Sequence, residues 1–411
     1  MAESTSSRKS LKTTEEVSVL RRAYYAKPQR ETGKKIAWHS QGFPVEILHA
    51  MDVVPVDLEN YASVISSKRL GSTYCAAGEA AGFSPDVCGY ARIFMGYLLG
   101  KDLPEPPYGG LSKPDVLMVN SYMCDSRLGW FFALSQHLKV PMFVLDEPHQ
   151  PDGGCDLIQN IVYTESSLRN MVSFLEEHTG TKIDLDKLRE IRKQARRANE
   201  IMNQINGMRK AIPCPMGSGD AFTVLWPLNF MRGTRECEEF YEKLLAELKE
   251  RVDKGIGVIP DEKFRLMWAG LPFWYNMRFL NYPEDFGGVV VIEGMVLFPT
   301  RYPMLPPQDD DPIKDIALTS TRQKQWPSGI GDTIDTVAQV VKDYSIDGVV
   351  VTFNPSCRLS YIPQQELMNG LIEHGIPCLG LECDMADERT YSEGQVKTRM
   401  DAFIESLLAR K

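Results

Sequence analysis

Cysteine is the residue type whose placement in this sequence points most directly to chemistry. The chain has 411 residues and nine cysteines, and no two of them have the CxxC spacing of a zinc ribbon or a thioredoxin motif. Three cysteines stand at or near the start of a predicted helix: Cys88, Cys124 and Cys357. Free N–H groups and the helix dipole at such a position stabilise a thiolate, which is the form of cysteine that binds metal or attacks carbon.

These three cysteines leave several kinds of site open. A single cysteine near a helix start most often fills core space, so core packing is the alternative for each of them. Three cysteines on separate strand–helix turns could also form one shared site. The candidates are a catalytic thiol with a base, a zinc site, and an iron–sulfur cluster with one iron left open. The other six lack this pattern and are expected to be core residues: Cys75, Cys155, Cys214, Cys237, Cys378 and Cys383.

The elements that must position these residues alternate between strand and helix in two blocks. Short apolar runs predict strands at 36–39, 53–56, 116–119 and 142–145, and again at 264–268, 289–292, 349–353 and 378–381. Between the blocks, apolar residues recur every three or four positions, which indicates amphipathic helices whose basic residues at 189–197 form a solvated face. A helix is expected to start at Ser84-Pro85, and the first twelve residues are expected to be disordered.

This alternation predicts an α/β fold with two doubly wound parallel-sheet domains and a helical middle segment. The expected units are a polar N-terminal extension with a helix at 1–33, a first α/β domain at 34–160, a helical segment at 161–255 and a second α/β domain at 256–411. Ligands bind beyond the carboxyl ends of strands in open parallel sheets. The polar residues expected at those ends in the first block are His39, Ser40, Gln41, Glu59 and Asn60.

Composition excludes several classes of partner. The formal net charge is −9, from 46 Lys+Arg and 55 Asp+Glu, which argues against general nucleic-acid binding. The first ten residues, MAESTSSRKS, lack the apolar core of a signal peptide, and no stretch approaches the roughly 20 apolar residues that span a bilayer. We therefore expect a cytoplasmic protein that binds neither nucleic acid nor membrane, and whose cysteines stay reduced.

Five segments resemble the 2-hydroxyacyl-CoA dehydratase and benzoyl-CoA reductase family, and the likeness covers nearly the whole chain from about residue 20. They are WHSQGFPVEILHAMDVVPVDLEN (38–60), SPDVCGYAR (84–92), MVNSYMCDSRLGWF (118–131), FNPSCRLSY (353–361) and IPCLGLECDMADERTYSEGQVKTRM (376–400). The resemblance implies that Cys88, Cys124 and Cys357 hold a [4Fe-4S] cluster with one open iron. It also implies an acyl-CoA substrate, a related second subunit, and a separate ATP-hydrolysing iron–sulfur activator that donates a low-potential electron. That electron turns the thioester carbonyl into a ketyl radical.

The resemblance also suggests roles for the polar residues. His39 is either a proton donor or a satisfied turn histidine, and Gln41 is a candidate for a hydrogen bond to the substrate carbonyl. Ser40, Glu59 and Asn60 are candidates for binding substrate, with a turn cap as the alternative for Glu59 and Asn60. The sequence has no ATP-binding motif, so any ATP hydrolysis is expected from a partner.

Two branches of the family remain open. Gln41 stands where the dehydratases carry a serine, and the loop GGLSKPD (109–115) and the CDSR run at Cys124 look more like benzoyl-CoA reductases, which reduce an aromatic ring. Cys75 has a counterpart in the larger, substrate-binding type of subunit. The alternative is the substrate-binding subunit of a 2-hydroxyacyl-CoA dehydratase, which forms an enoyl-CoA by radical dehydration. Two further alternatives are an electron-transfer or scaffold subunit with a fully ligated cluster, and cysteines that only fill the core.

Overall fold

The computed structural model describes residues 9–30, 33–149, 157–297, 304, 310–322 and 329–411. The expectation for Cys155 therefore lies outside the described residues. None of the described helices is both long enough and apolar enough to cross a membrane.

In the described part of the chain, eight strands form two parallel sheets of four strands each, which confirms the predicted fold class. The first sheet has the order β2-β1-β3-β4 and contains β1 (Ile36–His39), β2 (Val54–Asp57), β3 (Val116–Asn120) and β4 (Met142–Leu145). The second has the order β6-β5-β7-β8 and contains β5 (Phe264–Ala269), β6 (Gly288–Glu293), β7 (Gly348–Phe353) and β8 (Cys378–Glu382). All eight expected strands are present, because short buried strands of a parallel sheet read as continuous apolar runs.

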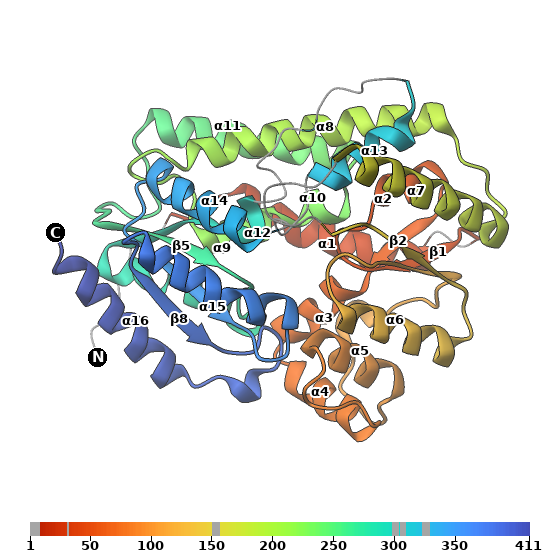
Figure 1. The fold of residues 1–411 in the computed structure, drawn as a ribbon, viewed down its shortest axis with the longest axis horizontal. Coiled ribbons are helices and arrows are strands. Elements are labelled where there is room, and N and C mark those ends of the chain that lie inside the picture. Colours follow the sequence, from red (N-terminus) through yellow and green to blue (C-terminus); the bar gives the residue numbers. More distant parts are fainter. Residues whose placement is uncertain (1–8, 31–32, 150–156, 298–303, 305–309, 323–328) are drawn as a thin grey trace.

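Helices cover both faces of each sheet (Figure 1). Alternate strand residues point to opposite faces, so Trp38 and Leu117 belong to one core cluster and Ala37 and Met118 to another. The first sheet is covered by α2 (Val45–Ala50) and α7 (Leu157–Thr179) on one side, and by α3 (Leu58–Ser67), α5 (Gly89–Leu99) and α6 (Asp125–Leu138) on the other. The second sheet lies between α14 (Ile330–Asp343) with α15 (Arg358–Glu373) and α16 (Glu393–Leu408) with the 3-10 segment η2 (Trp274–Phe286).

The middle of the chain is helical, as predicted. The long helices α8 (Leu185–Met208) and α11 (Arg235–Asp253) pack together and run past both sheets (Figure 1). The short helices α9 (Ser218–Val224) and α10 (Trp226–Phe230) lie between them in sequence, and α1 (Thr13–Arg30) packs on α9, α10 and α11. The other described elements are α4 (Gly71–Ala80), η1 (Pro107–Gly109), α12 (Gly294–Leu297), α13 (Pro312–Arg322) and η4 (Glu388–Thr390). The domain boundaries given above stay a prediction.

Three local expectations are wrong. The helix expected from Ser84-Pro85 starts only at Gly89, because the preceding residues form a turn. Glu59 and Asn60 belong to the first turn of α3 rather than to the end of a strand, since Asp57 accepts the Asn60 N–H at 2.6 Å and caps the helix. Residues 9–12 are placed rather than disordered, with the Lys9 N–H donating to the Val258 carbonyl at 3.1 Å.

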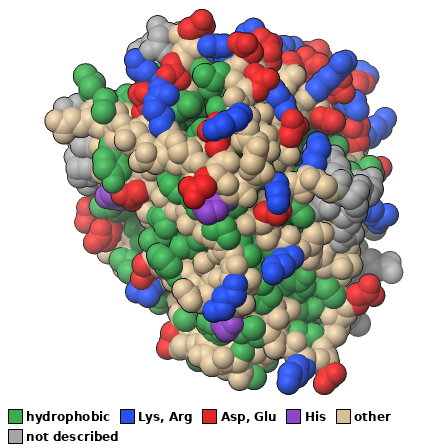
Figure 2. Space-filling model, turned by 90° about the vertical axis from the view of Figure 1, so that its right-hand side faces the viewer, with side chains coloured by type: hydrophobic (Ala, Val, Ile, Leu, Met, Phe, Trp, Pro, Cys, Tyr) green, Lys and Arg blue, Asp and Glu red, His purple; other side chains and the backbone are tan. Residues whose placement is uncertain are grey.

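The basic stretch of α8 is only partly a solvated face. Figure 2 shows charged side chains gathering at the top of the molecule, where α8 lies in Figure 1. Arg192, however, is 3% exposed and lies in the interior. Its guanidinium donates to Glu46 of α2 at 2.9 Å and to Asp315 of α13 at 2.8 Å. Burial alone would raise the pKa of Glu46, but the guanidinium groups of Arg232 and Arg192 hold it below its usual value.

We predict that Arg192→Ala lowers the free energy of unfolding by about 2–3 kcal/mol, because it removes one of the two guanidinium partners of each of two buried carboxylates and leaves only Arg232 beside Glu46 and Arg196 beside Asp315. The matched control is Lys193→Ala on the same helix, whose side chain is 67% exposed, and it should change stability by less than about 0.5 kcal/mol. Urea denaturation measures both. Equal stabilities of the two variants would contradict the buried ion-pair assignment.

Candidate functional site

The three cysteines singled out from the sequence all occupy the N-cap position of a helix. Cys88 precedes α5, Cys124 precedes α6 and Cys357 precedes α15. Cys124 follows β3 and Cys357 follows β7, and both strands are inner strands of their sheets. In each sheet the strand order changes direction beside that strand, which is where ligands bind in open α/β folds. The structure therefore places the candidate thiols where the sequence argument expected a site.

The three thiols lie close enough to affect one another. Burial raises the pKa of Cys88 well above its usual value, and the nearby thiols of Cys357 and Cys124 raise it further. Burial also raises the pKa of Cys124, and it raises that of Cys357 to about 11. Interaction with the backbone N–H three residues further along each helix opposes these shifts, but burial outweighs it.

Hydrogen bonds join the cysteine loops of the two sheet units. The Gly89 N–H donates to Ser356 Oγ at 3.0 Å, and Ser356 Oγ donates in turn to Asp384. The second carboxylate oxygen of Asp384 accepts the backbone N–H groups of Ala386 and Asp387 at 2.8 Å each. The residues flanking Cys88 and Cys357 thus share one buried network.

Arg92 braces the Cys88 loop. Its Nε donates to the Val87 carbonyl at 2.9 Å, and its Nη1 pairs with Glu79 at 2.7 Å and with Asp387 at 2.8 Å. Its side chain is 4% exposed. Arg92 therefore holds the turn that precedes α5 against the turn after β8.

A second buried network links the first turn of α6, which follows Cys124, to the turn after β1. Arg127 donates to Glu59 at 2.9 Å and to Asn120 Oδ1 at 2.5 Å, and Asn120 Nδ2 donates to the Gln41 carbonyl at 3.1 Å. The Glu59 carboxylate also lies close enough to Cys88 and Cys124 to raise their pKa values. Glu59 is therefore ion-paired with Arg127, and this network positions the turn after β1 next to the thiols.

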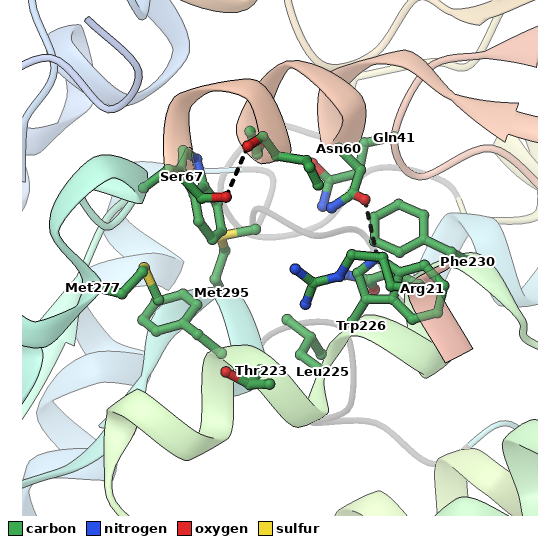
Figure 3. Close-up of a pocket in the computed structure, with 15 residues that line it drawn as sticks. Arg21, Gln41, Asn60, Ser67, Thr223, Leu225, Trp226, Phe230, Met277 and Met295 are labelled. Carbon is green, nitrogen blue, oxygen red and sulfur yellow. Dashed lines mark hydrogen bonds between the residues drawn. The ribbon is translucent and has the colours of Figure 1, made fainter. Parts of the chain in front are cut away.

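A cavity of about 120 Å³ opens beside these networks, between helices of both sheet units (Figure 3). Its wall combines apolar, aromatic and uncharged polar side chains with one arginine: Arg21, Gln41, Asn60, Ser63, Val64, Ser67, Phe222, Thr223, Leu225, Trp226, Asn229, Phe230, Trp274, Met277 and Met295. Trp274 Nε1 donates to the hydroxyl of Tyr90, which lies two residues after Cys88. The cavity wall is thus joined through Trp274 to the first turn of α5, directly after Cys88.

The predicted polar residues separate into two groups. Gln41 and Asn60 line the cavity, and Asn60 Oδ1 accepts from Tyr25 at 2.7 Å and from Trp226 at 2.9 Å. Ser40 is fully buried, and its hydroxyl accepts the Asn120 N–H at 3.2 Å.

His39 is 1% exposed, and its Nδ1 lies 3.0 Å from the Ser40 carbonyl. Its Nε2 is buried without a hydrogen-bond partner among the described residues. The Ser40 contact is that of a turn histidine, but Nε2 is not satisfied, so both interpretations of His39 stay predictions.

Sequence reasoning missed the contribution of the N-terminal helix. Arg21 projects into the cavity from α1, which the sequence suggested only as part of a polar extension. A signal was present, because Arg21 lies four residues after Val17 and four before Tyr25, on the face of the helix that is buried. The aromatic wall from α10 had no comparable signal.

Fold and site together define a two-unit α/β protein with three helix-capping thiols beside a cavity between the units. The chain belongs to the family described as 2-hydroxyglutaryl-CoA dehydratase, D-component, whose model matches residues 41–407. It is 27% identical to the (R)-phenyllactyl-CoA dehydratase alpha subunit of Clostridium sporogenes, over 93% of this chain and 92% of that protein. It is 25% identical to the alpha subunit of (R)-2-hydroxyglutaryl-CoA dehydratase from Acidaminococcus fermentans (92% and 93%) and 26% identical to a benzoyl-CoA reductase subunit from Thauera aromatica (92% and 89%).

These comparisons confirm the resemblance seen in the sequence. The relatives are named as subunits of enzymes on both branches, and their identities to this chain are nearly equal. They therefore establish an enzyme-subunit family without separating the reductase from the dehydratase.

The buried state of His39 leads to a pH prediction. Burial lowers the pKa of His39 from 6.5 to about 4, outweighing the Ser40 hydrogen bond. Between these values the unfolded chain binds a proton that the folded chain does not, so stability falls as the pH falls from about 6.5 to 4. This histidine contributes up to about 3 kcal/mol to that loss.

We expect His39→Gln to show a shallower loss of unfolding free energy over this range, measured by urea denaturation at several pH values. An unchanged slope would mean that His39 takes up its proton at the same pH in the folded and the unfolded protein, and would contradict the lowered pKa.

Proposed function

We propose that this chain is the substrate-binding subunit of an acyl-CoA enzyme, with a [4Fe-4S] cluster on Cys88, Cys124 and Cys357 and one iron left open. The observation that carries the proposal is the placement of three helix-capping cysteines, contributed by both sheet units, near one another and beside a cavity. Family membership supports it, since the relatives are named for reactions of CoA esters.

The donor set fits a cluster better than a single ion. Across the described ranges, no three His, Cys, Asp or Glu side chains converge closely enough to hold one metal ion. In a cluster each cysteine binds a different iron, so the sulfurs surround a volume instead of meeting at one point. Thiolates are the soft ligands that such clusters select. When bound, the cluster would supply one low-potential electron to the thioester.

The residues of the chain itself bind and orient the thioester. Asn60 Oδ1 is already used by Tyr25 and Trp226, so its amide N–H groups are left to face the cavity, as does Gln41. Donors aimed at the thioester carbonyl stabilise the negative charge that develops on its oxygen during reduction. The aromatic wall excludes water, which strengthens these hydrogen bonds.

The shape of the site suits a long ligand. A second hollow of about 60 Å³ shares Gln41 and Asn229 with the cavity and is lined further by Tyr122 and Arg232. A CoA thioester placed at Gln41 has its acyl group in one hollow and its pantetheine arm in the other.

For the reaction, ring reduction of the benzoyl-CoA reductase type through a ketyl radical is the first candidate. The family resemblance places Gln41 where the dehydratases carry a serine, and the cavity is lined by four aromatic side chains, Phe222, Trp226, Phe230 and Trp274. Radical dehydration of a 2-hydroxyacyl-CoA is the second candidate, favoured by the names of several relatives.

The proposal also includes partners. The relatives are each named as one subunit of an enzyme, which supports a related second subunit for this chain. The lack of an ATP-binding motif in the sequence supports a separate ATP-hydrolysing iron–sulfur activator as the electron donor, in a cytoplasm that keeps thiols reduced.

We expect anaerobically purified protein to contain about four irons per chain, and serine substitution of Cys88, Cys124 or Cys357 to remove most of them. Cys378→Ser is the matched control, because Cys378 is a half-buried thiol on β8 outside the site. Iron determination and absorbance near 400 nm measure the outcome. Equal iron in Cys124→Ser and Cys378→Ser would overturn the cluster assignment.

The branch is decided by the product. We expect the complex with its activator, ATP and reductant to convert benzoyl-CoA to a product heavier by two hydrogens, measured by mass spectrometry under anaerobic conditions. Loss of water from a 2-hydroxyacyl-CoA, with benzoyl-CoA unchanged, would instead establish the dehydratase.

A further inference from the structure

Arg21 is the one charged side chain in the described wall of the cavity. It extends from α1, and its guanidinium lies among Asn60, Leu225 and Trp226 (Figure 3). The guanidinium carbon is 5.8 Å from the centre of the Trp226 ring. No Asp or Glu belongs to the described lining residues, so no carboxylate in this part of the wall neutralises the guanidinium.

The hydrogen-bonding capacity of Arg21 is incompletely used. Its Nε is buried and has no hydrogen-bond partner among the described residues. This differs from the other arginines near the site, since Arg92 and Arg127 are each paired with carboxylates. A partly buried guanidinium without an acidic partner is costly unless a ligand supplies the anion.

The neighbours of Arg21 favour an anion as well. Asn60 lines the cavity and its oxygen already accepts from Tyr25 and Trp226, so its amide N–H groups are the polar atoms that it can offer to a ligand. Arg21 and Asn60 therefore both offer donors toward the same space. Their combination suits an oxyanion with at least two acceptor oxygens, which a guanidinium binds through paired N–H groups.

We propose that Arg21 is the anion-binding residue of this cavity and holds an oxyanion of the acyl-CoA ligand. This inference rests on the proposed function and deepens it. Two parts of such a ligand carry that chemistry, namely a phosphate of CoA and a carboxylate on the acyl group. Arg21 is thus a residue that determines which acyl-CoA or which end of it occupies the cavity.

The test measures dissociation constants by calorimetry for the full-length chain with three probes: free coenzyme A, glutaryl-CoA and pentanoyl-CoA. The last two have acyl chains of equal length and differ by the terminal carboxylate. The variants are Arg21→Gln and Arg21→Lys. The matched control is Arg22→Gln, an exposed neighbour on the same helix.

If Arg21 holds a phosphate, Arg21→Gln weakens all three probes by about tenfold or more, the usual effect of losing a charged hydrogen bond. If it holds a carboxylate, only glutaryl-CoA is weakened. Arg21→Lys keeps the positive charge but loses the two parallel N–H groups of the guanidinium, so its effect on the dissociation constants is intermediate. If Arg21→Gln fails to fold, Arg21→Lys is used for the test.

Two outcomes overturn different claims. Binding of all three probes to the Arg21 variants with the same affinity as to Arg22→Gln overturns the inference while leaving the proposed function intact. Failure of the wild-type chain to bind any of the three overturns the proposed function, and the inference with it.

Discussion

The hydrogen bond from the Gly89 N–H to Ser356 Oγ is the contact on which the arrangement of the site depends. Gly89 follows Cys88 in the first unit, and Ser356 precedes Cys357 in the second, so this bond fixes the two thiols relative to each other. A Cβ at Gly89 would come within 2.9 Å of Asp384 Oδ1, so the close approach requires glycine. Asp384 and Arg92 hold the two sides of the contact in place.

The buried charges around the site are paired with one another, and the cavity lies beside these paired groups. Arg92 is satisfied by Glu79 and Asp387, and Arg127 by Glu59 and Asn120. Such networks are costly to break once they are buried, which keeps the cysteine loops rigid. Hydrogen-bond donors that could bind a ligand are offered to the cavity by Gln41, Asn60 and Arg21.

The sequence was informative where local pattern decides structure. The eight strands are short apolar runs, and each candidate cysteine stands at a helix start, so both could be predicted without the fold. The start of α5 was misplaced because Ser84-Pro85 is a stronger local helix signal than the true N-cap, Cys88.

Other features depend on partners far away in the sequence. Arg192 reads as part of a solvated basic stretch, and only the packing of α8 on α2 and α13 reveals its two buried carboxylates. Arg21 reads as part of a polar extension, and only the packing of α1 on α10 places it in the cavity. Burial also reverses the expectation for the thiols, since it outweighs the stabilisation that a helix N-terminus gives to a thiolate.

We propose that three cysteines from two units hold a cluster whose fourth position stays open beside the cavity. Anomalous diffraction at the iron absorption edge, from crystals grown anaerobically, tests it most directly. We expect iron density bonded to the sulfurs of Cys88, Cys124 and Cys357, with no fourth protein ligand. Iron density elsewhere, or a fourth side chain completing the ligand set, would contradict it.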